Sequence, residues 1–292
     1  MARPTHSAPI PSPSKTAAAT LQKRFPEAII IGVKKAGTRA LIEFLRLNPH
    51  IKAPGPEVHF FDRHYDEGFD WYRKQMPETT EGDVTIEKSP AYFINKLAPE
   101  RIKQFNPKMK LIVVLREPVT RAISDYTQAS TKKRRLGQMP TFERMAVGDC
   151  APWSRANCSV KTHGVNAGWG AIRIGVYQKY LKRWLAHFPT EQFHFVDGQA
   201  LIDNPAEEVG KVEKFLGLEP VVKPSNFAVD PIKQFPCIKQ ENGSLHCLGK
   251  TKGRKHPKVS EPVLRRLKRF YEPENERLFG LIHKRLDWNN SH

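Results

Sequence analysis

Short apolar runs alternate along the chain with stretches in which apolar residues recur at the spacing of a helix. The apolar runs are rich in branched residues and bounded by turn formers, which predicts buried strands at 28–33, 84–88, 110–116 and 192–198. Helical periodicity between and after them predicts helices at 38–47, 67–76, 98–105, 118–132 and 171–188. This alternation is typical of an α/β fold with a mostly parallel central sheet and helices on both faces.

The two ends of the chain differ from this pattern. Residues 1–24 are mainly Ala, Pro, Ser and Thr with scattered bases, so they cannot bury enough surface to offset their ordering entropy. We predict a disordered tail or stem there and one folded domain over 25–292. Amphipathic helices are predicted near 205–217 and 260–271. No apolar run approaches the roughly 20 residues that span a bilayer, so we expect no membrane span.

The chain is strongly basic. Lys and Arg number 48 against 30 Asp and Glu, which gives a formal net charge of +18. This excess exceeds what solubility requires and favours a polyanionic partner, although a merely basic surface is the simpler alternative. Nucleic acid, an acidic membrane surface and an anionic polysaccharide fit the charge equally. Nucleic acid is disfavoured, because zinc-finger spacing and an aromatic RNA-binding signature are absent from the sequence.

Four cysteines bear on the compartment. Cys237 and Cys247 enclose a short polar loop that a crosslink would fix, and we favour a disulfide there over free thiols. Cys150 and Cys158 enclose a similar loop with weaker support, and Asn157 begins a glycosylation sequon. Together these features favour an oxidising, secretory compartment.

A glycine-containing loop joins the first predicted strand to the first predicted helix. It reads GVKKAGT from Gly32 to Thr38, and a helix N-terminus after a parallel strand presents unpaired amides to an anion. Loops for nucleotide triphosphates place a lysine after the second glycine and use the next hydroxyl to hold magnesium. Here Thr38 follows Gly37 directly, while Lys34 and Lys35 lie inside the loop. The loop therefore predicts an anion site unlike that of a kinase, with a plain strand-to-helix turn as the alternative.

A second candidate anion site follows the predicted strand 110–116. Arg116 ends that strand, a helix starts at Pro118, and Ser124 falls about two turns later, near the face of Arg121. An arginine beside a hydroxyl suits a phosphate group. A well-capped helix start with a solvated arginine would explain the same residues.

Five motifs resemble those of the heparan sulfate glucosaminyl 3-O-sulfotransferases: GVKKAGTRAL, EVHFFDR, IEKSPAYF, LREPVTRAISDYTQ and CLGKTKGRKHP. The similarity runs from about Phe25 to Trp288. It implies a P-loop-like sulfotransferase fold that binds 3′-phosphoadenosine 5′-phosphosulfate (PAPS) and requires no metal. The resemblance assigns the 5′-phosphosulfate to Lys35, Ala36, Gly37, Thr38 and Arg39, and the 3′-phosphate to Arg116 and Ser124.

The same resemblance implies how the acceptor hydroxyl would be activated. Glu57 would be the general base, with His59 and Asp62 close enough to orient or tune it. Lys35 and Lys88 would stabilise the leaving group. Without the resemblance, an exposed loop carboxylate and a packed histidine would be the simpler interpretation of EVHFFD.

Two further groups of residues come from the resemblance. The polysaccharide would meet Lys34, Arg39, Glu43 and Gln128. The segment that would close over the donor, as a lid together with the cysteine loop, contains Lys252, Gly253, Arg254, Lys255 and His256. The chain departs from the family pattern at Ala36, where many relatives have glycine, and over 145–168.

These features predict transfer of a sulfuryl group from PAPS to the 3-hydroxyl of glucosamine in heparan sulfate. We expect a monomer in the Golgi lumen, with no membrane anchor in this chain. A non-catalytic heparan sulfate binding protein on the same fold is the alternative from another class. A small-molecule kinase is disfavoured by the loop, which lacks the lysine and metal-ligand pattern that phosphoryl transfer needs.

Overall fold

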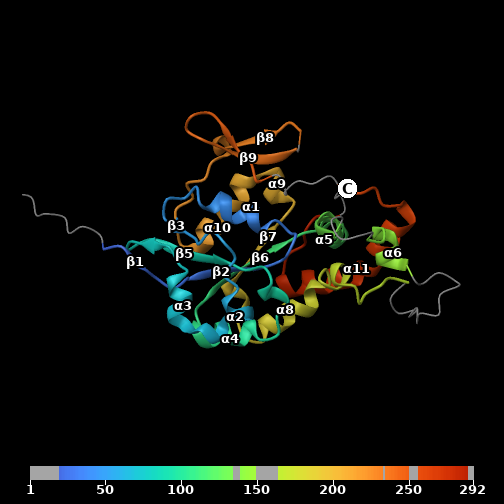
Figure 1. The fold of residues 1–292 in the computed structure, drawn as a ribbon, viewed down its shortest axis with the longest axis horizontal. Helices are drawn as coiled ribbons and strands as arrows, with labels where there is room; N and C mark the ends of the chain where they lie inside the picture. The colour runs from blue at the N-terminus through green and yellow to red at the C-terminus, as the bar shows by residue number, and fades with distance from the viewer. Residues whose placement is uncertain (1–19, 134–138, 149–163, 233, 250–255, 289–292) are drawn as a thin grey trace, which may run out of the picture.

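The computed structural model describes residues 20–133, 139–148, 164–232, 234–249 and 256–288. A five-stranded parallel sheet forms its centre, in the order β3-β5-β2-β6-β7 (Figure 1). Its strands are β2 (Ala28–Gly32), β3 (Ile51–Lys52), β5 (Val84–Lys88), β6 (Lys110–Leu115) and β7 (Phe193–Asp197). The four predicted strands and the parallel α/β fold are confirmed. The two-residue strand β3 was not predicted, because it is too short to carry a pattern.

Helices cover both faces of this sheet. On one face lie α1 (Thr38–Leu45), α9 (Ala200–Asp203) and α10 (Pro205–Leu216) (Figure 1). The other face is covered by α2 (Phe60–Arg63), α3 (Gly68–Lys74), α4 (Ala98–Phe105) and α8 (Tyr177–Leu185). Fully buried side chains from β2, β6, α1 and α8 join in one large hydrophobic core.

A smaller hydrophobic cluster lies beside the main one. It is built by α5 (Pro118–Lys133), α6 (Phe142–Val147), α7 (Gly170–Arg173) and α11 (Glu261–Ile282). Short 3-10 helices span Tyr65–Glu67 (η1), Tyr92–Ile94 (η2), Thr190–Gln192 (η5) and Pro224–Asn226 (η6). Within the described part of the chain, no helix has both the length and the apolar character needed to cross a membrane.

Two predicted helices have different bounds in the structure. The predicted helix 171–188 is divided into α7 and α8, with Gly175 between them. A Cβ at Gly175 would lie 2.8 Å from the Tyr271 hydroxyl, so this position packs too closely for a side chain. The helix predicted to end at residue 271 continues to Ile282 and contains Pro273. Pro273 has no N–H, so the helix loses one main-chain hydrogen bond to the carbonyl oxygen of Arg269. Arg269 is exposed, so water can hydrogen-bond to that carbonyl instead.

A three-stranded antiparallel sheet, which was not predicted, lies over α1 and α9 (Figure 1). It is formed by β8 (Phe227–Asp230), β9 (Phe235–Lys239) and β10 (Leu245–His246). The predicted disulfide between Cys237 and Cys247 is present and joins β9 to the end of β10. The cysteine loop is therefore a crosslinked hairpin rather than an irregular loop. Cys150, Cys158 and Asn157 lie outside the described residues.

The folded structure reaches back ahead of residue 25. β1 (Gln22–Lys23) pairs with β4 (Glu78–Thr79) in a two-stranded antiparallel sheet. The Arg24 guanidinium also donates a hydrogen bond to the Thr80 carbonyl. Residues 22–24, which we assigned to the tail, thus contact the domain. Residues 1–19 lie outside the described part of the chain.

Candidate active site

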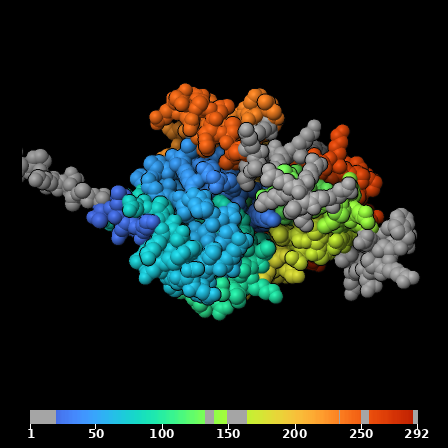
Figure 2. Space-filling model, viewed as in Figure 1, coloured from blue at the N-terminus to red at the C-terminus, as the bar shows by residue number. Residues whose placement is uncertain are grey.

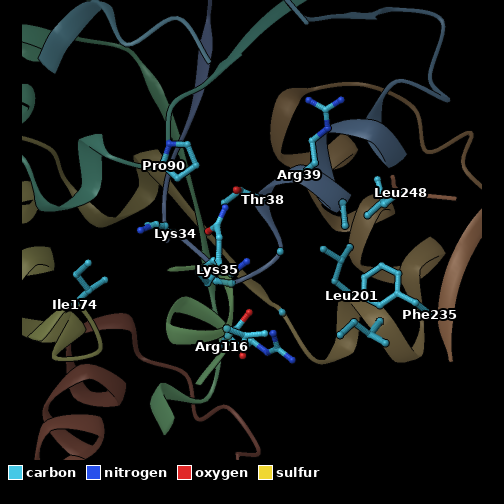
Figure 3. Close-up of a pocket in the computed structure, with 18 of the residues that line it drawn as sticks. Lys34, Lys35, Thr38, Arg39, Pro90, Arg116, Ile174, Leu201, Phe235 and Leu248 are labelled. Carbon is cyan, nitrogen blue, oxygen red and sulfur yellow. The ribbon is translucent and has the colours of Figure 1, made fainter. Parts of the chain in front are cut away.

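A cavity of about 1150 Å³ opens at the carboxyl ends of β2, β5, β6 and β7 (Figure 3). Ligands bind at this edge of a parallel sheet because the loops that leave it can diverge. Most of the predicted site residues line the cavity: Lys34, Lys35, Ala36, Gly37, Thr38, Arg39, Glu57, His59, Arg116, Ser124, Gln128 and His256. The two candidate anion sites predicted from separate motifs therefore belong to one cavity. In the space-filling view, the orange segment that contains β8 and β9 lies over the blue N-terminal part of the domain (Figure 2).

The glycine-containing loop lies between β2 and α1 on the cavity wall (Figure 3). Gly37 has φ +119°, a left-handed conformation that favours glycine, and α1 begins at the next residue. The first amides of α1 lack helical partners and are available to an anion. Ala36 is buried, so the alanine that departs from the family pattern is accommodated by packing.

The loop after β7 supports the glycine-containing loop from the side. Gly198 donates a main-chain hydrogen bond to the Leu115 carbonyl at 2.7 Å. A Cβ at Gly198 would lie 2.4 Å from the Ala36 carbonyl oxygen, so only glycine fits between the two loops. Gly198 and its neighbours were not predicted as site residues. The rule that ligands bind beyond the carboxyl ends of strands would have identified them, since a predicted strand ends there.

Glu57 and Lys88 are in direct contact. The Lys88 ammonium donates to Glu57 Oε1 at 2.5 Å, across 31 positions of the chain. On the other side of the carboxylate, His59 Nε2 lies 3.3 Å from Glu57 Oε2. The His59 ring then reaches Asp62 through Nδ1 at 3.1 Å. The four predicted residues thus form one chain of contacts, in which Glu57 lies between a cation and an imidazole held by a second carboxylate.

The contacts of Glu57 set its ionisation. Burial acts to raise the pKa of Glu57, but the hydrogen bond and charge of Lys88, followed by those of His59, outweigh it and hold the pKa below its usual range. Burial lowers the pKa of Lys88, and Glu57 opposes that shift. At neutral pH Glu57 is therefore a carboxylate, able to accept a proton.

Arg116 lies on another part of the cavity wall and has different surroundings (Figure 3). Its Nε is buried and has no hydrogen-bond partner among the described residues. Burial lowers the pKa of Arg116, with Tyr177 and Glu117 opposing that shift, and the guanidinium remains charged. Ser124 lines the same cavity from α5. A buried donor on a charged group requires an acceptor, which an anionic ligand would supply.

Of the five residues predicted to form the lid, His256 lies within the part of the chain that the structure describes. It lines the cavity, and burial, followed by the charges of Arg116 and Lys35, lowers its pKa to about 4. The imidazole is therefore neutral at physiological pH. The other predicted lid residues, Lys252, Gly253, Arg254 and Lys255, lie outside the described residues.

Arg121 does not reach the cavity, although helical spacing placed it near the face of Ser124. It is fully buried and donates to the carbonyl oxygens of Lys34 and Ala171. It also contacts Asp125 at 3.1 Å, and Asp125 holds the Lys34 ammonium at 2.9 Å. Arg121 and Asp125 therefore support the glycine-containing loop from beneath.

Glu43 lies behind the cavity wall rather than on it. Its Oε1 contacts Arg39 at 2.9 Å and Arg46 at 2.6 Å. Arg46 in turn donates to the carbonyl of Pro54 at 2.7 Å, three residues before Glu57. In this structure Glu43 orients Arg39 and the lead to Glu57.

An apolar part of the cavity was not predicted. Leu201, Phe235 and Leu248 lie near one another on one side of the cavity (Figure 3). Phe235 and Leu248 belong to the hairpin crosslinked by Cys237 and Cys247. The sequence alone could not place these residues in the cavity, because their placement depends on where the hairpin lies over the sheet.

Comparisons with known proteins show the family of the chain. Residues 25–280 match the family model described as Sulfotransferase domain. The chain is 47% identical over 270 residues to heparan sulfate glucosamine 3-O-sulfotransferase 3B1 of Homo sapiens, covering 91% of this chain and 66% of that protein. It is 44% identical over 301 residues to heparan sulfate glucosamine 3-O-sulfotransferase 6 of Mus musculus, covering 97% of this chain and 83% of that protein. The chain thus spans just under two thirds of the length of the first relative.

A solved structure supports the fold. The crystal structure of a sulfotransferase from Alicyclobacillus acidocaldarius matches with a TM-score of 0.62 at 21% identity, over 91% of this chain and 100% of that one. With the family match and the curated relatives, the chain belongs to the sulfotransferase family, within the group of the heparan sulfate glucosamine 3-O-sulfotransferases.

Proposed function

We propose that this chain transfers the sulfuryl group of PAPS to the 3-hydroxyl of glucosamine units in heparan sulfate. The observation that carries the proposal is the meeting of three features in one cavity: a loop suited to an anion, the ionised Glu57 held by Lys88, and Arg116 with a buried, unpaired Nε. The acceptor is taken from the names of the relatives.

The donor would be held between two groups of cations. When bound, PAPS supplies an activated sulfuryl group whose departure leaves a phosphate. The amides at the start of α1, together with Lys35 and Thr38, would bind the 5′ end. Arg116 and Ser124 would bind the 3′-phosphate, which satisfies the buried Nε. The apolar side of the cavity suits an uncharged ring system.

Glu57 would act as the general base on the acceptor. Its carboxylate accepts the hydroxyl proton as the sugar oxygen forms its bond to sulfur, on the side opposite the departing phosphate. His59, held by Asp62, keeps the second oxygen of Glu57 in place. Lys88 and Lys35 would stabilise the negative charge that develops on the leaving phosphate. None of these steps requires a metal. We therefore predict that transfer proceeds without one.

The acceptor chain would lie along the exposed cations of the cavity. Lys34 is 54% exposed and fixed by Asp125, and Arg39 is 45% exposed and fixed by Glu43. Fixed, exposed cations suit a sulfated polysaccharide, because little side-chain freedom remains to be lost on binding. Gln128 on α5 adds a neutral donor and acceptor at the same cavity.

A non-catalytic heparan sulfate binding protein remains the alternative function. The cluster around Glu57 favours catalysis, because a site that only binds a polyanion gains nothing from a carboxylate in the cavity. Incubation with sulfur-labelled PAPS and defined heparan oligosaccharides tests the proposal. We expect new sulfate at the 3-hydroxyl of glucosamine. Binding of the oligosaccharides without transfer would support the alternative, and sulfate at another position would overturn the assigned acceptor.

A further inference from the structure

A buried carboxylate that the proposed chemistry does not use lies behind the candidate base. Glu87 of β5 is fully buried, one residue before Lys88. Successive side chains of a strand point to opposite faces, so Glu87 points away from the Lys88–Glu57 contact. Burying a carboxylate is costly unless hydrogen bonds compensate for its lost hydration. Glu87 therefore needs a reason to lie there.

Hydroxyl groups surround this carboxylate. Tyr72 of α3 donates to Glu87 Oε2 at 2.9 Å, and Ser89 donates to Oε1. Burial raises the pKa of Glu87 to about 7, and the hydrogen bonds of Ser89 and Tyr72, the Tyr92 hydroxyl of η2 and the charge of Lys88 oppose that shift.

Two of these hydroxyls continue to the segment that carries the catalytic candidates. Ser89 Oγ accepts a hydrogen bond from the main-chain N–H of His59 at 3.0 Å. The Tyr92 hydroxyl accepts from the main-chain N–H of Phe61 at 3.2 Å. Ser89 uses its hydroxyl hydrogen in the bond to Glu87, which leaves the serine lone pairs directed at the His59 N–H. The Glu87 carboxyl group thus sets the direction of the Ser89 O–H bond.

The main chain at His59 requires such support. Its φ is +56°, in the left-handed region that residues other than glycine adopt only where neighbouring groups hold them. The His59 ring lies between Glu57 and Asp62, so the direction of its backbone determines where the imidazole meets the base. Glu57 itself is 42% exposed and depends on these contacts for its orientation.

We propose that Glu87 is a positioning residue for the base: through Ser89 it fixes the main chain of His59 and so aims the imidazole at Glu57. This inference rests on the proposed function, in which Glu57 takes the proton. Glu87 touches neither substrate nor donor. Its effect must therefore appear in the rate of the transfer step and pass through Glu57.

Glu87→Gln and Ser89→Ala test this role. A glutamine amide that turns its NH2 group towards Ser89 cannot accept the serine hydroxyl, and alanine at position 89 removes the acceptor for the His59 N–H. We expect each variant to lower kcat about 10- to 100-fold, since small misplacements of reacting groups cost rates of that order. The Kd for the desulfated donor, measured by calorimetry, should stay within about twofold because the anion sites are untouched.

Tyr72→Phe is the matched control. It removes a hydrogen bond to the same carboxylate on the side away from His59, so it should lower Tm while kcat stays within about twofold. The decisive measurement repeats Glu87→Gln and Ser89→Ala in a Glu57→Gln background, by single-turnover assay. If Glu87 acts through Glu57, neither change lowers the residual rate further.

The possible outcomes separate the two proposals. A Glu57→Gln enzyme with most of its rate overturns both the base and the role of Glu87. A slow Glu57→Gln enzyme that Glu87→Gln slows by the same further factor as in the wild type overturns only the role of Glu87. A loss of kcat in Tyr72→Phe as large as in Ser89→Ala also overturns it, since general loosening of the core would then explain the effect.

Discussion

The charged groups on two sides of the cavity differ in whether they already have partners: those around Glu57 form the first wall, and Arg116 forms the second. Around Glu57 each charged group already has a partner: Lys88, His59 and Asp62 lie in one chain of contacts. Arg116 is half-buried, and its buried Nε has no partner among the described residues. The first wall is organised before any ligand arrives, as a base must be if it is to work without reorganisation. The second wall gains its missing contact only from a ligand.

The first wall should show the largest effect when its carboxylate is replaced. Glu57→Gln keeps the shape but cannot accept the hydroxyl proton, so we expect the transfer rate to fall about 10²- to 10⁴-fold. The Kd for the desulfated donor should barely change. Rate assays and calorimetry test this, with Glu100→Gln as a control at an exposed carboxylate on α4. Retention of most activity in Glu57→Gln would remove the base assignment.

The second wall should respond in binding. Arg116→Ala is expected to weaken binding of the desulfated donor by about 1.5–3 kcal/mol, the range for hydrogen bonds to a charged group. This corresponds to a Kd that rises between about 10- and 150-fold. Arg265→Ala is the control for loss of one positive charge, since that side chain is 69% exposed on α11. An unchanged Kd for Arg116→Ala in calorimetry would place the 3′-phosphate elsewhere.

The pH dependence of kcat sharpens the comparison. In the folded protein, burial raises the pKa of Glu57, but the hydrogen bond and charge of Lys88 outweigh burial and lower it. The base therefore stays ionised until the pH falls below the usual pKa range of a glutamate. Lys88→Met removes that cation and leaves the effect of burial, which raises the pKa. We expect the acid limb of the kcat profile to move to higher pH in this variant. The acid limb should not move in Arg116→Ala, and equal movement in both would contradict separate roles for the two walls.

Reduction of the disulfide should have the smallest effect. The bond between Cys237 and Cys247 closes a loop of about ten residues, worth about 2–3 kcal/mol in the chain-entropy picture. Phe235 and Leu248 flank it and line the cavity, so a loosened hairpin should raise the KM for donor severalfold. The Tm of the core should change only modestly. Kinetics of the Cys237→Ser/Cys247→Ser protein measure this, and an unchanged KM would separate the hairpin from donor binding.

Four strands of the central sheet could be predicted because each is a short run rich in branched and aromatic residues, and such a run is visible without knowing which residues it contacts. The hairpin could not. Its strand β9 contains Pro236, which argues against a strand, and β10 is two exposed residues long. What makes the hairpin stable is a crosslink and its position over the sheet, and neither leaves a periodic pattern.

Part of the candidate site was also readable from the chain. The loop before α1 and the arginine after β6 were predicted as candidate anion sites from residue type and spacing, each with a plain structural alternative. The Lys88–Glu57 contact depends on β5 pairing beside β2, with Lys88 opposite Ile30, which spacing does not contain. Helical geometry accounts for Arg121: it shares a face with Asp125, whereas Ser124 shares the cavity face with Gln128. A three-residue separation was too coarse to tell these faces apart.

The pairing of Gln22–Lys23 with Glu78–Thr79 has a practical consequence for handling the protein. These residues precede β2 and β5, so they lie at the amino ends of the central strands, while the cavity opens at the carboxyl ends. The sheet of β1 and β4 therefore lies at the end of the domain opposite the cavity. A resin or sensor surface coupled to a residue of this small sheet would lie away from the cavity mouth, which suits measurements with long, bulky polysaccharides.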